Sequence, residues 1–139
     1  MPGLQPDQAR ERFAAARVAR LATVRSDGTP HLVPVTFAVA ADQIVFAVDH
    51  KPKSTRALRR LDNIAANPRV ALLVDSYDED WSRLWWVRAD GLARVHPDPT
   101  GLRGLPEALR DRYAAYRAVP PVGPFVVVDV TRWSGWSAV

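Results

Sequence analysis

The feature that most constrains the fold is a series of short apolar segments, separated by turn residues, into which one helical segment is inserted. Apolar and β-branched residues concentrate in the ranges 18–25, 29–39, 44–48, 69–75, 81–96 and 125–136. A parallel α/β sheet needs a helix between most of its strands, but only residues 54–66 fall cleanly between two of these segments. The pattern therefore predicts a mainly β (α+β) protein. We expect a small antiparallel barrel of about six strands with a few short helices, in a single domain spanning residues 1–139.

Turn and breaker residues locate the connections. Asp27-Gly28 is a strong hairpin signal between the first two strands. Proline lacks a backbone N–H, so Pro30 and Pro34 place the second strand at a sheet edge or a bulge. Asp90-Gly91 predicts a bulge or tight turn within the fifth strand. The apolar run at 69–75 predicts a strand that is buried on both faces.

Helical spacing is present in three segments. Residues 5–17 and 106–118 are expected to form short amphipathic helices near the two ends of the chain. Residues 54–66 form the helix between strands, for which Ser54 or Thr55 is the expected N-cap.

The chain lacks the residue patterns of a self-sufficient catalytic site. It has no cysteine, which excludes disulfides, thiolate zinc sites and a cysteine nucleophile. Its three histidines do not have metal-site spacing, and the Rossmann, P-loop and G-x-S-x-G patterns are absent. We predict no catalytic side chain, so any difficult chemistry would belong to a bound cofactor. The polar N-terminal segment and the short apolar runs predict a cytoplasmic protein that does not insert into a membrane.

The stretch DHKPKSTRALRR, residues 49–60, contains both lysines of a chain whose other seventeen basic residues are arginines. Its cations, Lys51 and Lys53 first, lie between an apolar strand and the start of a helix. Free N–H groups and the helix dipole attract anions at such a place. The stretch is therefore either a phosphate-binding turn or a solvated basic helix face.

The aromatic residues suggest a planar ligand or a packed interface. Trp81, Trp85 and Trp86 are expected on one strand, where Trp85 and Trp86 face opposite sides. Arg88 shares the face of Trp86, where it either contacts an anion or forms an ion pair with Asp90. Core or dimer packing is the alternative role for most of the tryptophans. Likewise Thr36 and Phe37 either meet the polar edge of a ring system or simply pack within a strand.

Taken in order, the segments LATVRSDGTPHLVPVTF, DHKPKSTRALRRLDNIAANPRVALLVD and DWSRLWWVRADGLARV resemble the pyridoxamine 5′-phosphate oxidase-like superfamily. Its members are split β-barrels of the flavin-reductase and FMN-binding type, and the sequence is most similar to their deazaflavin-dependent branch. The resemblance covers residues 19–95 well and the remainder in outline. It implies a homodimer with two cofactor sites at the subunit interface.

The resemblance also implies roles for particular residues. Lys51, Lys53, Ser54, Thr55 and Arg56 would hold the cofactor phosphate, and Thr36, Phe37, Val48 and Asp49 would line the flat ring. Trp81 and Trp86 would close the pocket, Trp133 would reach in from the other subunit, and Arg88 completes the predicted cofactor-binding set. The Arg-x-His pattern by which pyridoxamine phosphate oxidases hold their substrate is missing from the C-terminal TRWSGWSAV. Oxidation of vitamin B6 is therefore not expected.

The function expected from these observations is hydride transfer between a deazaflavin, coenzyme F-420, and a small unsaturated substrate. FMN is the alternative cofactor. A second hypothesis is a non-catalytic protein that binds a flavin, a deazaflavin or haem. A third is a nucleic-acid-binding barrel, suggested by the net charge of +4 and the aromatic residues. We disfavour the third because the cations concentrate at one turn rather than along a groove, and we expect no nucleic-acid partner.

Overall fold

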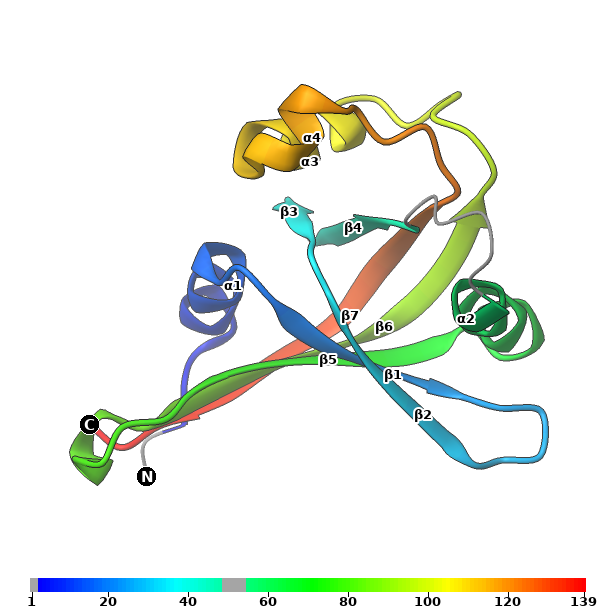
Figure 1. Ribbon diagram of the computed structural model, residues 1–139. Helices are drawn as coiled ribbons and strands as arrows, with labels where there is room; N and C mark the ends of the chain where they lie inside the picture. The colour runs from blue at the N-terminus through cyan, green and yellow to red at the C-terminus, as the bar shows by residue number, and fades with distance from the viewer. Residues whose placement is uncertain (1–2, 49–54) are drawn as a thin grey trace.

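The computed structural model describes residues 3–48 and 55–139, and the side chains of residues 3–48 and 59–139. In chain order the elements are α1 (Pro6–Ala15), β1 (Ala19–Val24), β2 (Pro30–Val35), β3 (Ala38–Ala40), β4 (Gln43–Ala47), α2 (Thr55–Ala66), β5 (Arg69–Ser76), the 3-10 helix η1 (Trp81–Arg83), β6 (Trp85–His96), α3 (Leu105–Arg112), α4 (Ala114–Ala118) and β7 (Phe125–Ser137) (Figure 1). No helix among the described residues is long and apolar enough to cross a membrane.

The seven strands form one antiparallel sheet with the order β2-β1-β5-β6-β7-β4-β3. β2 and β3 stand at opposite edges of this sheet, although only Thr36 and Phe37 separate them in the sequence. Two residues cannot span seven strands spaced about 4.8 Å apart, so the sheet must curl until its edges approach each other. The described strands β2 and β3 share no ladder, which leaves the barrel split along that seam. The predicted split β-barrel is confirmed, with seven strands instead of about six because residues 29–39 divide into two.

Local sequence explains the first hairpin. Asp27 accepts hydrogen bonds from the backbone N–H and the hydroxyl of Thr29, at 3.0 and 2.6 Å. Gly28 adopts a φ of +87°, which a residue without a Cβ tolerates. β2 is an edge strand, where its two prolines leave few ladder bonds unmade. The hairpin and the edge position are both confirmed.

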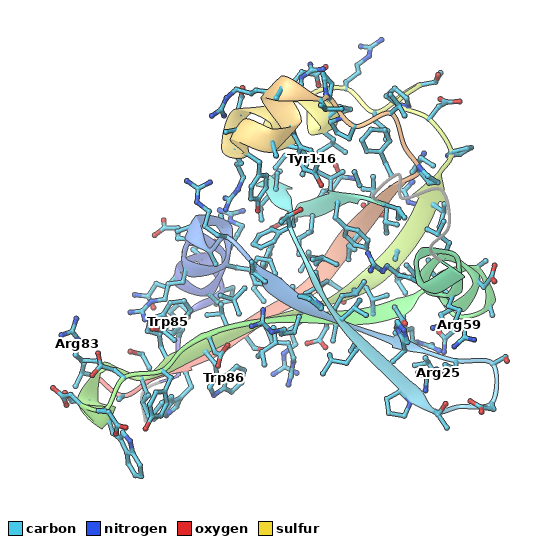
Figure 2. The ribbon with its side chains drawn as sticks, viewed as in Figure 1. Arg25, Arg59, Arg83, Trp85, Trp86 and Tyr116 are labelled. Carbon is cyan, nitrogen blue, oxygen red and sulfur yellow. The ribbon has the colours of Figure 1, made fainter. Side chains whose placement is uncertain are left out.

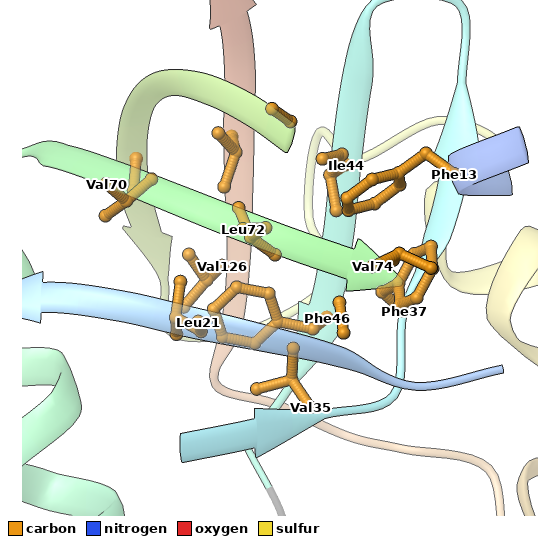
Figure 3. Packing of buried hydrophobic residues seen from close by; sticks show 14 of the residues in the cluster. Phe13, Leu21, Val35, Phe37, Ile44, Phe46, Val70, Leu72, Val74 and Val126 are labelled. Atoms are coloured by element: carbon orange, nitrogen blue, oxygen red, sulfur yellow. The ribbon is translucent and has the colours of Figure 1, made fainter. Parts of the chain in front are cut away.

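The main core fills the inside of the barrel. Leu21, Phe46, Leu72 and Val126 are almost completely buried there, each from a different strand (Figure 3). Helix α1 closes one end, where Phe13 packs on Phe37 and Trp133 with ring centroids 4.9 and 5.4 Å apart. Because inward-facing residues alternate along each strand, the barrel wall keeps a second, outward face.

A second cluster lies outside the barrel wall, between α3 and the strands β3, β4 and β7. Leu105 and Leu109 of α3 pack there on Val45, Phe125 and Val127. β4 and the start of β7 are therefore buried on both faces, by the barrel interior and by the helix. This cluster attaches the α3–α4 unit to the barrel (Figure 1).

Helix α2 packs against β1 and β6. Leu61 is partly buried and Ile64 is buried against the core. The Asn63 side-chain amide donates to the Thr23 hydroxyl at 3.1 Å, a buried bond that ties the helix to the first hairpin. Thr55 begins the helix, and the other suggested cap, Ser54, lies outside the described residues.

Three expectations about the elements are corrected. β5 is buried on its inner face only, and Leu73 is 37% exposed because none of the described residues covers the outer face there. The strand expected at residues 81–96, which is β6, begins only at Trp85 because residues 81–83 form η1. The helix expected at 106–118 is two helices, α3 and α4, that break at Tyr113, whose backbone is extended.

The predicted bulge in β6 is confirmed. Its register against β7 shifts between Asp90 and Gly91. A Cβ on Gly91 would lie only 2.5 Å from the backbone oxygen of Asp129. Only glycine allows the two strands to approach this closely.

Candidate functional site

A hollow of about 460 Å³ lies on the outer face of the sheet, where β5, β6 and β7 extend beyond β1. We call it the aromatic groove. It is lined by Leu73, Asp75, Ser76, Tyr77, Leu84, Trp85, Trp86, Arg88 and Trp136. Its volume falls within the roughly 300–1,000 Å³ typical of small-molecule sites, and its mainly apolar lining is also typical of them.

The floor of the aromatic groove is set by strand register. Trp86 of β6 stands opposite Trp136 of β7, so the two indoles share one face of the sheet. The Arg88 guanidinium lies 5.8 Å from the centre of the Trp86 ring, and its Nε donates to Asp90 Oδ2 at 3.1 Å. The ion pair suggested between Arg88 and Asp90 is confirmed, and the anion contact of Arg88 stays a prediction. The aromatic surface remains open to a flat partner.

Trp85 and Trp86 face opposite sides of the sheet, as expected from strand geometry. Trp85 packs against the core beneath α1, and the Arg12 guanidinium lies 5.3 Å from its ring centre. Trp81 stands on η1 at the tip of the β5–β6 arm and is 68% exposed. Asp80 orders that tip by accepting the Ser82 backbone N–H and hydroxyl, bonds that lower the pKa of the Asp80 carboxyl.

A second candidate feature is a group of four basic side chains between α2 and the first hairpin: Arg25, His31, Arg59 and Arg60, here called the basic cluster. Thr23 stands opposite His31 in the β1–β2 register and is bonded to Asn63, one helical turn beyond Arg60. That contact brings the hairpin and the helix together. Figure 2 shows Arg25 and Arg59 side by side at this end of the molecule.

The basic cluster is electrostatically unbalanced. None of its side chains forms an ion pair within the described part of the chain. Burial lowers the pKa of Arg60, and burial together with the charges of Arg25, Arg60 and Arg59 lowers the pKa of His31. Among the described residues, Arg60 Nε and His31 Nδ1 are buried without a hydrogen-bond partner. Buried polar atoms normally have partners, so this cluster has the chemistry to accept an oxyanion.

The predicted ring-contacting residues occupy different environments. Thr36 is exposed, and its hydroxyl lies 3.2 Å from the Tyr116 hydroxyl. Phe37 is fully buried in the core, and its backbone N–H and carbonyl are both within hydrogen-bond distance of the Tyr113 hydroxyl. Val48 is buried, and its N–H donates to the carbonyl of Pro124.

The predicted phosphate contacts fall outside what the structure describes. Lys51, Lys53 and Ser54 lie outside the described residues, as do the side chains of Thr55 and Arg56. Asp49, which was predicted to line the flat ring, also lies outside them. Their proposed roles stay predictions. The structure does place α2, and with it the basic cluster, directly after this stretch.

The Trp133 side chain packs inside its own chain. It is 8% exposed, packs on Phe13, and its indole N–H donates to Asp42 Oδ1 at 3.0 Å. Of the remaining predicted residues, Trp86 and Arg88 share the aromatic groove. Sequence reasoning missed Trp136, Tyr77 and Leu73 as groove residues and His31 in the basic cluster. For these residues the only signal in the nearby sequence was a second tryptophan, Trp136, close to Trp133 on the last strand.

Within one chain the two features stand apart. Trp86 lies near one end of the sheet, while Arg25 and Arg59 lie near the other (Figure 2).

The family description for pyridoxamine 5′-phosphate oxidase matches residues 5–137, so the chain belongs to that family. A search of curated proteins gives no significant match. Three solved structures illustrate the likeness. A conserved hypothetical protein of Mycobacterium tuberculosis is 23% identical, with a TM-score of 0.76 over 97% of this chain and 86% of the other. An FAD-binding protein of Mesorhizobium loti is 24% identical, with a TM-score of 0.71 over 96% and 93%. An F-420 reductase is 30% identical, with a TM-score of 0.59 over 88% and 94%.

Proposed function

We propose that this protein is a homodimeric oxidoreductase that binds a phosphorylated flavin-type cofactor, with coenzyme F-420 as the first candidate and FMN as the alternative. The observation that carries the proposal is the basic cluster, where the buried Arg60 Nε and His31 Nδ1 lack a hydrogen-bond partner among the described residues. The choice of a deazaflavin rests on the 30% identity to an F-420 reductase. An FAD-binding protein among the structural neighbours supports a flavin-type ligand more generally.

The residues present fit such a cofactor at both of its ends. Arg59 and Arg60 supply charge-assisted hydrogen bonds to a phosphate, and Lys51 and Lys53 would add to them. The indoles of Trp86 and Trp136 offer a flat apolar surface for a ring system. When bound, the cofactor supplies the hydride chemistry. The chain's own residues fix the phosphate, orient the ring and keep water from it.

The proposed dimer follows from the uncovered outer face of the sheet. Leu32, Leu73 and Leu92 are 67%, 37% and 44% exposed, and the strand registers place them on that one face. Contiguous exposed apolar surface usually marks an interaction site. The face also carries both signs of charge, including Asp75 and Arg88, which is compatible with a self-complementary two-fold interface. A second copy would bring the groove of one chain toward the basic cluster of the other.

Titration of the purified protein with F-420, FMN and FAD, followed by cofactor fluorescence, tests the proposal. We expect F-420 to bind, with an affinity at least about tenfold weaker in Arg60→Gln because one charge-assisted bond is lost. Arg103→Gln, which changes an exposed loop arginine, is the matched control. Binding of FMN without F-420 would reject the deazaflavin, and failure of all three cofactors to bind would reject the proposal.

The second candidate is a protein that binds the same cofactor without turnover. This candidate is favoured because polar groups of the groove already form hydrogen bonds within the chain, which leaves fewer of them to act on a substrate. Arg88 bonds to Asp90, and the Tyr77 hydroxyl bonds to Glu79 at 3.2 Å. Mixing the protein and reduced F-420 with a panel of conjugated enones, quinones and nitro compounds distinguishes the two functions. Oxidation of F-420 that depends on both the protein and a substrate supports the enzyme. Binding without oxidation supports the carrier.

A further inference from the structure

A second cleft lies on the far side of the β5 edge, next to the aromatic groove. β1 pairs with β5 only as far as Arg20 opposite Leu73, whereas β5 continues to Ser76. The edge of β5 at residues 74–76 therefore has no neighbouring described strand on that side. A space of about 380 Å³ fills the gap between this edge and the segment joining α1 to β1. We call it the guanidinium cleft.

Three arginines from successive parts of the chain line this cleft. Arg12 comes from α1, Arg17 from the linking segment and Arg20 from β1, while Asp75 is the one acidic residue in the lining. None of the three arginines has an ion-pair partner within 4.0 Å among the residues the structure describes. Three guanidinium groups outnumber the single carboxylate of Asp75, so the lining carries a net positive charge. Because like charges repel one another, this lining favours a bound anion.

Two of the guanidinium groups are held in place before any ligand arrives. Arg12 is stacked over Trp85 at 5.3 Å. Arg17 Nη1 donates to the backbone oxygen of Arg112 at 2.6 Å, and its guanidinium lies 5.9 Å from the centre of the Tyr113 ring. Each still carries N–H donors beyond those contacts, since a guanidinium has five. Ordering these side chains in advance reduces the entropy lost on binding.

The guanidinium cleft adjoins the aromatic groove. Asp75, Ser76 and Trp85 line both spaces. The Trp85 ring supplies an apolar wall beside the cations, a combination that suits an anion attached to an organic group. The small side chains of Ala15 and Ala16 keep the cleft open on the helix side.

We propose that the guanidinium cleft binds a small organic oxyanion, a carboxylate or a phosphate ester. The anionic group contacts Arg12, Arg17 and Arg20, and its organic part lies against Trp85. The oxyanion belongs either to a separate reactant held beside the aromatic groove or to an anionic extension of a cofactor that occupies the groove. This binding site does not depend on the redox function proposed above.

Calorimetric titration of the full-length protein with benzoate, and separately with inorganic phosphate, tests the proposal. We expect saturable binding of benzoate at one site per chain, and weaker binding of phosphate because phosphate lacks a ring. Arg20→Gln removes an exposed side chain with no described partner, so it should fold normally, as checked by its melting temperature. Its affinity for benzoate should be at least about tenfold lower, the cost of one charge-assisted hydrogen bond. Arg103→Gln should bind as the wild type does.

Repeating the benzoate titration with saturating F-420 or FMN identifies the source of the anion. Loss of benzoate binding assigns the cleft to the cofactor's own anionic group, and unchanged binding assigns it to a separate reactant. No saturable binding of either probe to the wild type, or equal affinity in Arg20→Gln, overturns the proposal. Measuring cofactor affinity in Arg60→Gln and in Arg20→Gln separates the two proposals. If only Arg60→Gln weakens cofactor binding, that result bears on the proposed redox site and not on the guanidinium cleft.

Discussion

The junction between β2 and β3 depends on one phenol group, and removing it gives a sharp test of the fold. The Tyr113 hydroxyl accepts the Phe37 N–H at 3.1 Å. It lies 3.0 Å from the Phe37 carbonyl and 2.9 Å from the Arg17 carbonyl, to one of which it donates. Tyr113→Phe keeps the ring but leaves the backbone N–H of a fully buried residue without its partner.

An unsatisfied buried donor costs about 1–3 kcal/mol. For a chain of this length, 1 kcal/mol shifts the melting temperature by roughly 4 °C. We therefore expect Tyr113→Phe to melt about 4–12 °C below the wild type, with a matching loss of unfolding free energy in urea. Tyr116→Phe is the control, because its hydroxyl pairs with the exposed Thr36, and it should cost no more than about 0.5 kcal/mol. If both variants unfold within 0.5 kcal/mol of the wild type, about the limit for a surface change, the Tyr113 bonds do not stabilise this junction.

Three further predictions concern β5 and the basic cluster. Leu72→Ala should lower the unfolding free energy by about 2–5 kcal/mol, because Leu72 is fully buried. Leu73→Asp, one residue along, should leave the chain folded by circular dichroism but dissociate the proposed dimer in sedimentation; a variant that stays dimeric would place the interface elsewhere. The pKa of His31 is lowered in the folded state. The stability that depends on neutral His31 should therefore be fully present above 6.5, the ordinary pKa of histidine. The free energy of unfolding should fall as the pH drops from there toward the pKa of the folded state. His31→Gln should flatten the dependence of urea stability on pH over that interval, and an unchanged slope would show that His31 does not contribute.

The elements governed by local chemistry are predictable from the sequence. Asp27-Gly28 fixes the first hairpin, the prolines fix an edge strand, and Asp90-Gly91 fixes the bulge, because each depends on the backbone preferences of one or two residues. Where tertiary contacts decide, the sequence is less informative. The break at Tyr113 follows from hydrogen bonds to Phe37, 76 residues away. The strand expected from Trp81 starts later because Asp80 caps a short 3-10 turn.

The apolar run of β5 shows a different limit. Its composition predicts burial on both faces, yet the residues that the structure describes leave one face uncovered. An apolar pattern indicates that a surface is buried, but it does not indicate whether the same chain or another chain buries that surface. The basic cluster was hidden for a related reason: His31 lies far from Arg59 and Arg60 in sequence, and only the packing of α2 on the hairpin brings them together.

The position of β7 in the sheet has a consequence for how the protein acquires its shape. β7 is the last strand along the chain, yet it joins β6 to β4. Until it is present, the β3–β4 hairpin has no strand beside it, and the barrel remains an open fragment with exposed edges. Pairings between β4 and β7 span about eighty residues, a separation typical of slow folding. A nascent chain on the ribosome would therefore stay incomplete, and open to aggregation or chaperone binding, until β7 has been synthesised.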